Sequence, residues 1–190
     1  LNITGASTIL GPVILNDGIL DIDANTLISG DITHTASSTI NIANGITLTY
    51  SGSAVSIGAF TLDLQSAGTA TIANTNAFSL GAGSTLQSAA AYTISGPILL
   101  AGGTLDIDAA TTISGDITHT ASSTINVDGG ITLIYSGAAV DVGAFTLSLQ
   151  GGGTGTIANT NAITLGTGAT LQTTGAYTIT GPVILNDGTL

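Results

Sequence analysis

Apolar and polar residues alternate over short stretches along the whole chain. Thr39–Ile42 reads TINI, Thr61–Leu64 reads TLDL and Thr104–Ile107 reads TLDI, so every second residue is aliphatic. A period of two is the pattern of a β-strand with one buried face. The 3.6-residue spacing of an amphipathic helix is missing, and Thr, Ile, Val and Gly, which disfavour helices, are abundant. The sequence therefore predicts an all-β fold.

The strand pattern belongs to a long internal repeat. Ser29–Ile40, SGDITHTASSTI, returns unchanged at Ser114–Ile125, 85 residues later. Aligning residues 18–102 with residues 103–187 leaves roughly two-thirds of the positions identical without a gap. Each repeat divides into four subrepeats of 20, 22, 24 and 19 residues, the first set beginning at residues 18, 38, 60 and 84. Such periods indicate a solenoid, whose coils bury their apolar faces by stacking on their neighbours.

Each subrepeat contains about three apolar strand segments, separated by turns rich in Gly, Asn, Pro and Ser. We predict a parallel β-solenoid (β-helix) with about three short strands per coil, coils of 19–24 residues and four coils per 85-residue repeat. Nine coils spaced about 4.8 Å apart would make a rod of about 43 Å. The chain would be one continuous solenoid over 1–190, composed of a partial repeat 1–17, repeats 18–102 and 103–187, and the start of a next repeat at 188–190. We expect it to belong to a longer array.

Threonine precedes most of the inward positions of the first strand, and these threonines should point outward. We predict that they form a ladder along the rod, made of Thr39, Thr61, Thr85, Thr104, Thr124, Thr146 and Thr170. A second file follows the second strand, with Thr47, Thr71, Thr93, Thr112, Thr132, Thr156 and Thr178. Threonine favours strands and can hydrogen-bond between coils, which is the structural interpretation. A hydroxyl lattice that binds ice or sugar is the functional one. We favour the first because two walls carry threonine.

The composition excludes several functions. The chain has no Lys, Arg, Cys, Met or Trp, and its net charge is −11. Binding to nucleic acid or to an anionic lipid surface depends on basic residues, so neither partner is expected. Zero cysteines exclude disulfides and thiolate metal sites. No apolar run approaches the roughly 20 residues of a membrane-spanning helix, so we expect no membrane insertion.

The aspartates, but not the two histidines, offer a candidate metal site. Asp106, Asp108 and Asp128 should lie close together on adjacent coils, where a cation would relieve their repulsion. A weak calcium site is one interpretation, because calcium prefers oxygen ligands, and a solvated acidic face is the one we favour. His34 and His119 lie four coils apart, about 19 Å, so they cannot share a metal. We expect both to be buried and hydrogen-bonded, and we expect no cofactor beyond weakly bound calcium.

One apolar motif recurs at the third strand. Pro12–Leu15, Pro97–Leu100 and Pro182–Leu185 are apolar on both sides of the strand. The outward residues Ile14, Leu99 and Ile184 would form an exposed apolar row. Such a row is a candidate for lateral contact between rods.

The xTLxL and xTIxI strands, the TISG turns at Thr93–Gly96 and Thr112–Gly115, and the Gly-Thr-Leu restarts resemble large secreted bacterial β-solenoid adhesins. These include filamentous-haemagglutinin-like proteins and autotransporter passengers. The resemblance covers the whole chain, although the coil lengths here are more variable. It implies a right-handed helix, export to the cell surface, and a role in adhesion or biofilm formation.

We do not expect an enzyme. Polysaccharide lyases and polygalacturonases also use parallel β-helices, but they rely on Arg or Lys, and this chain has neither. We predict an extracellular, structural or adhesive fibre or adhesin shaft, located at the cell surface, that self-associates into filaments or bundles. Surface glycans are a further candidate partner. Two alternatives stay open: an ice- or polysaccharide-binding solenoid that uses the threonine ladders, and a functional amyloid of a biofilm matrix.

Overall fold

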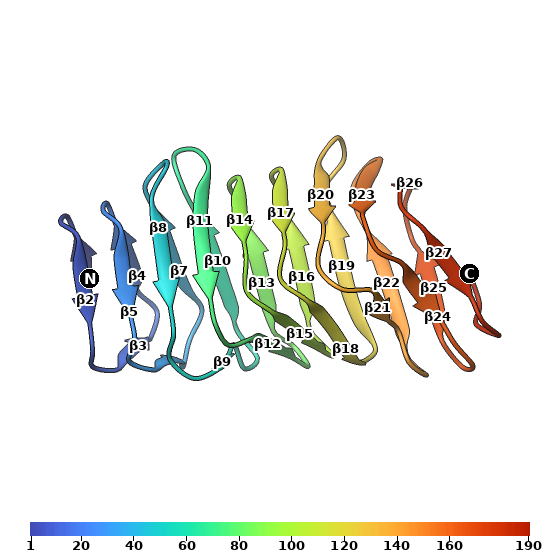
Figure 1. Cartoon of the computed structure of the whole chain (residues 1–190), viewed down its shortest axis with the longest axis horizontal. Helices are drawn as coiled ribbons and strands as arrows, with labels where there is room; N and C mark the ends of the chain where they lie inside the picture. Colours follow the sequence, from blue (N-terminus) through green and yellow to red (C-terminus); the bar gives the residue numbers. More distant parts are fainter.

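The computed structural model describes all residues, 1–190, and contains 27 β-strands and no helix. The strands stack along the long axis of a rod, with the N-terminus at one end and the C-terminus at the other (Figure 1). Every strand pair in the named sheets is parallel, and the stacked coils complete about eight turns of roughly 22 residues each. The prediction of an all-β parallel solenoid is therefore confirmed.

The first strands of the coils form one continuous sheet, here called wall one. Its nine strands are β1 (Asn2–Ile3), β4 (Ile19–Ile22), β7 (Ser38–Ile42), β10 (Thr61–Gln65), β13 (Thr85–Ser88), β16 (Thr104–Ile107), β19 (Ser123–Val127), β22 (Thr146–Gln150) and β25 (Thr170–Thr173).

The second strands form another continuous sheet, wall two. Its nine strands are β2 (Ser7–Ile9), β5 (Thr26–Ile28), β8 (Thr47–Tyr50), β11 (Ala70–Asn74), β14 (Tyr92–Ile94), β17 (Thr111–Ile113), β20 (Thr132–Tyr135), β23 (Gly155–Asn159) and β26 (Tyr177–Ile179).

The third strands form wall three, which is divided into sheets of two, four and three strands. They are β3 (Val13–Leu15) with β6 (Ile32–His34); β9 (Val55–Ser56), β12 (Phe78–Gly81), β15 (Ile98–Ala101) and β18 (Ile117–Ala121); and β21 (Val140–Asp141), β24 (Ile163–Leu165) and β27 (Val183–Leu185).

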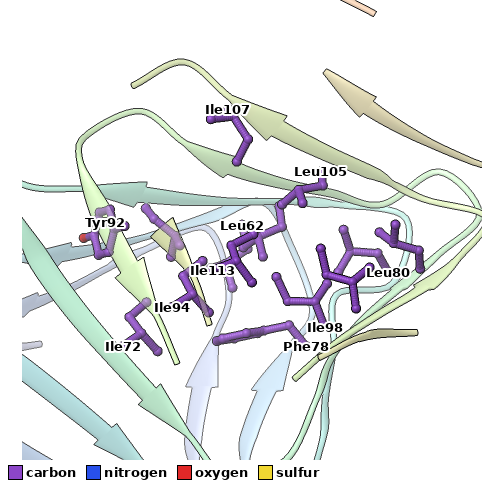
Figure 2. Packing of buried hydrophobic residues seen from close by; sticks show 14 of the residues in the cluster. Leu62, Ile72, Phe78, Leu80, Tyr92, Ile94, Ile98, Leu105, Ile107 and Ile113 are labelled. Carbon is purple, nitrogen blue, oxygen red and sulfur yellow. The ribbon is translucent and has the colours of Figure 1, made fainter. Parts of the chain in front are cut away.

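Aliphatic side chains from the three walls meet inside the rod and make a single core of 41 buried residues. Leu62 pairs with Leu86, and Leu86 with Leu105, so corresponding residues of successive coils stack on the same inward face. Figure 2 shows Leu62 and Leu105 from wall one approaching Ile94 of wall two and Ile98 of wall three. The period-two pattern therefore identifies the buried face correctly.

The two repeats differ at one core position in a way that changes packing. Phe78 of β12 is buried and lies beside Ile98 (Figure 2). Its equivalent 85 residues later is Ile163 of β24. Around Ile163, residues that include Tyr135 and Leu149 enclose an apolar cavity of about 20 Å³. The smaller aliphatic side chain leaves space that the phenyl ring occupies in the first repeat.

Glycine is required where the backbone of one coil lies directly on the next. A Cβ atom at Gly115 would lie 1.9 Å from the carbonyl oxygen of Gly96, and one at Gly96 would lie 1.8 Å from that of Asn74. The Asn74 side chain also joins these two coils by hydrogen bonds. Its Oδ1 accepts from the Gly96 N–H, and its Nδ2 donates to the Pro97 carbonyl. Asn159 makes the same contacts with Gly181 and Pro182. The corner between walls two and three is therefore closely packed in both repeats.

Candidate functional site

The outward threonines of wall one do not form one unbroken ladder. Thr61, Thr85, Thr104 and Thr124 lie opposite one another on four successive strands. Thr146 lies opposite Thr170 on the next two strands. Thr39 instead lies opposite Asp63. Thr124 likewise lies opposite Ser148. The predicted row is thus divided into separate segments, and all seven of its threonines are half-buried.

A two-residue register shift causes both interruptions. Leu64, rather than Leu62, lies opposite Ile40, and Leu149 lies opposite Ile125. At the corner before each shifted strand, the Thr61 and Thr146 N–H groups donate to serine hydroxyls of the preceding coil, Ser37 and Ser122, each at 3.1 Å. A shift by two keeps aliphatic side chains inside, so it costs no core contact.

Carboxylates alternate with amides on the outer face of wall one. Asp63, Gln87, Asp106 and Asn126 lie opposite one another in four consecutive strands. The Asn126 Nδ2 donates to Asp106 Oδ1 at 2.5 Å, and the Asn41 Nδ2 donates to the Asp21 carboxylate at 2.7 Å. The amides therefore supply donors to carboxylates that have no basic partner anywhere in the chain.

Two of the three carboxylates proposed for calcium, those of Asp106 and Asp108, are bound by amides. Gln87 donates to Asp108 at 2.6 Å, in addition to the bond between Asn126 and Asp106. Burial raises the pKa of Asp106, the Asn126 amide opposes that rise, and the carboxylates of Asp108 and Asp128 add to it. No group of three or more His, Cys, Asp or Glu side chains has an arrangement that could hold a metal ion. The geometry thus gives no support to a calcium site at Asp106, Asp108 and Asp128.

Both histidines lie inside the rod, with 7% of His34 and 6% of His119 exposed. Their Nδ1 atoms are bonded to the carbonyl oxygens of Ile57 at 2.9 Å and Val142 at 3.0 Å, so Nδ1 carries the proton. Phe60 and Phe145 contact the two rings edge to face, and neither Nε2 has a partner. Burial lowers the pKa of His119. Burial and the bond at Nδ1 suit both rings to a structural role in packing the corner of the rod.

The outer face of wall two is uncharged. Its outward side chains comprise nine threonines, two alanines, Leu27 and Ile134. By contrast, the strands of wall one carry Asp21, Asp63 and Asp106 on the outer face, and wall three carries Asp141. Wall two is therefore the one wall that is both continuous and free of outward charge.

The threonine file predicted on wall two is present with one interruption. Four threonines are paired in succession, Thr47, Thr71, Thr93 and Thr112. Thr132, Thr156 and Thr178 form a second row, and Thr112 faces Ile134 instead of Thr132. Sequence reasoning overlooked Leu27 and Ile134. The signal was available, because both stand between two inward residues of a predicted strand.

The predicted apolar row on wall three is wrong. Ile14 lies opposite Thr33, Leu99 lies between Ser79 and Thr118, and Ile184 lies opposite Thr164. The three aliphatic residues recur every 85 residues and so stand four coils apart, about 19 Å, with Ser, Thr or Asp on the strands between them. Ile14 and Ile184 are 67% and 43% exposed, but they make no continuous surface.

No helix of the structure is long and apolar enough to cross a membrane. Comparison of the chain with protein-family models, with curated proteins and with solved structures gives no match. Its architecture is that of a β-solenoid, and what it does has to be argued from the surfaces described above.

Proposed function

We propose that the chain is a segment of an extracellular, structural or adhesive fibre built from tandem solenoid repeats and that it has no catalytic function. The main support is the similarity of the two repeats on both the inner and the outer face of the rod. Residues that build the rod recur, such as Asn74 with Asn159 and Tyr50 with Tyr135. Most outward residues recur as well, such as Asp21 with Asp106 and Thr61 with Thr146, although Asp63 is replaced by Ser148. A chain in which no coil is specialised is suited to mechanical extension rather than to chemistry at one place.

The packing also suits a fibre. Fully buried aliphatic side chains each stabilise a fold by about 1.5–3 kcal/mol, and they occur on every coil of this rod. Each strand pairs only with the strands of adjacent coils, so further coils extend the rod without changing its cross-section. The absence of Lys and Arg removes every trypsin site, which suits exposure outside the cell.

Electron microscopy and fibre diffraction of the native assembly test the proposal. We expect long, unbranched filaments with a reflection near 4.8 Å along the fibre axis and a repeat of about 19 Å from four coils. Globular particles without an axial period would contradict it.

A second candidate is a surface for ice or polysaccharide. The paired threonines of wall two, which include Thr71 and Thr93, favour it because they form an ordered array of hydroxyls without charge. Thermal hysteresis or glycan binding by the purified chain is then expected, and Thr→Val substitutions along wall two should abolish it. Unchanged binding by those variants would exclude this surface.

A further inference from the structure

Wall two is the place where this rod can meet another copy of itself. The chain carries a net charge of −11 and has no Lys or Arg, so two copies cannot form ion pairs through their side chains. A contact through wall one would bring the outward Asp21, Asp63 and Asp106 against a second acidic surface, and wall three carries the outward Asp141. The strands of wall two present only threonine, alanine, leucine and isoleucine.

The shape and size of this wall also fit a paired face. Its nine strands form one unbroken sheet, whereas wall three is divided. With strands of three to five residues, it covers about 43 Å by about 12 Å, or about 500 Å² on each copy. Two copies that overlap over most of this wall would bury about 900 Å², which is close to the roughly 1,000 Å² above which specific interfaces are found and indicates weak pairing of single chains. A longer array would bury area in proportion to its number of coils.

Wall two carries only two large aliphatic side chains on its outer face, Leu27 and Ile134. Leu27 is on β5, the second strand of the sheet, and Ile134 is on β20, the seventh. The point midway between them lies between β11 and β14, close to the central strand of the sheet, β14. A two-fold axis through this point, perpendicular to the rod, would place the strand of Leu27 in each copy opposite the strand of Ile134 in the other. Along these strands the two side chains would be offset by two residues, or about 7 Å.

We propose that two copies pair face to face and antiparallel through wall two, with Leu27 and Ile134 at the centres of two equivalent contacts. The inference rests on the proposed fibre, because it names the surface through which fibres bundle. Threonine methyl groups and the two aliphatic residues interdigitate between the sheets, as they do in dry sheet-to-sheet contacts. Repulsion between two acidic rods opposes the pairing, so added salt strengthens it.

Sedimentation equilibrium of the purified chain tests the contact. We expect a monomer–dimer equilibrium whose dissociation constant falls as NaCl is raised from low to physiological concentration. Ile134→Asp places a charge at the contact and should raise the dissociation constant about 30-fold or more. Ile184→Asp makes the same change at a similarly exposed residue of wall three and should leave the dimer unchanged. A wild-type chain that stays monomeric in salt, or equal effects of the two variants, would overturn the pairing.

Cross-linking tests its direction. The chain has no cysteine, so Leu27→Cys and Ile134→Cys introduce single thiols. A bismaleimide should join a mixture of the two variants and should leave each variant alone largely uncoupled. Coupling of the Leu27→Cys variant to itself would overturn the antiparallel arrangement. Native filaments that show the axial repeat but never lie side by side would overturn the pairing without contradicting the proposed fibre. The absence of filaments would contradict the proposed fibre itself.

Discussion

At the scale of single residues, the two repeats act as internal controls for each other. They share most inward positions, so a difference between them isolates the effect of one side chain in an almost constant surrounding. Phe78 and Ile163 are such a pair. The first fills its part of the core, and the second leaves an apolar cavity beside Leu149. A cavity without polar lining is expected to stay dry and to lower stability.

This pair yields a reciprocal prediction. Ile163→Phe should fill the cavity and raise the free energy of unfolding by about 1 kcal/mol, as cavity-filling substitutions commonly do. Phe78→Ile should create a similar cavity in the first repeat and lower that free energy by about 1–2 kcal/mol. Urea denaturation followed by circular dichroism measures both. If both substitutions raised the free energy of unfolding, or both lowered it, the cavity would not explain the difference in stability between the two repeats.

At the scale of strands and turns, the sequence predicts which residues face inward but not which strand positions are neighbours. A shift of one residue would turn Leu62 and Leu64 to the solvent, and the alternation forbids it. A shift of two leaves both residues inside, so the hydrophobic pattern carries no information about it. The break in the threonine ladder between Thr39 and Thr61 arises in this way.

The same reasoning explains the failed prediction on wall three. Ile14, Leu99 and Ile184 are equivalent in the repeat, but equivalent residues are not neighbours in the stack. Four coils separate equivalent residues, so a row of neighbours has to be sought among residues about 20 apart. Leu27 and Ile134, by contrast, were recognisable from alternation alone, because each stands outward on a predicted strand.

The glycine stack at the corner between walls two and three provides a prediction about turns. Gly115→Ala would bring its Cβ to 1.9 Å from the Gly96 carbonyl oxygen, and backbone on both coils would have to move. We expect a loss of about 3 kcal/mol in the free energy of unfolding. Gly166→Ala is the matched control, because no atom lies within 4 Å of a Cβ there. Thermal or urea unfolding of the two variants should differ clearly, and equal stabilities would exclude the steric explanation.

At the scale of the whole molecule, the rod is a one-dimensional stack in which each coil depends on its neighbours. Whole repeats should therefore be removable. Deleting residues 18–102 joins Asp17 to Gly103, which reproduces the natural junction of Asp187 with Gly188. We expect the shortened chain to keep its parallel β-structure and to unfold cooperatively at a lower urea concentration.

A shorter deletion serves as the control. Removing residues 18–92 joins Asp17 to Thr93, so a segment of wall two would follow directly on wall three. This chain retains more residues, yet it should lose cooperative unfolding because its coils no longer match. Circular dichroism and limited proteolysis would distinguish the two products. Equal cooperativity would mean that the coils do not fold as a stack of matched units.

The stacking of coils along the axis also determines how the rod would respond to tension. The hydrogen bonds that join the coils run along the pull, so a load applied at the ends would act on one coil at a time. A coil of about 20 residues occupies about 4.8 Å in the rod but spans roughly 70 Å when drawn out. Each coil that separates from the stack would thus add many times its original height to the length of the rod, so the proposed fibre would lengthen stepwise under load before it breaks.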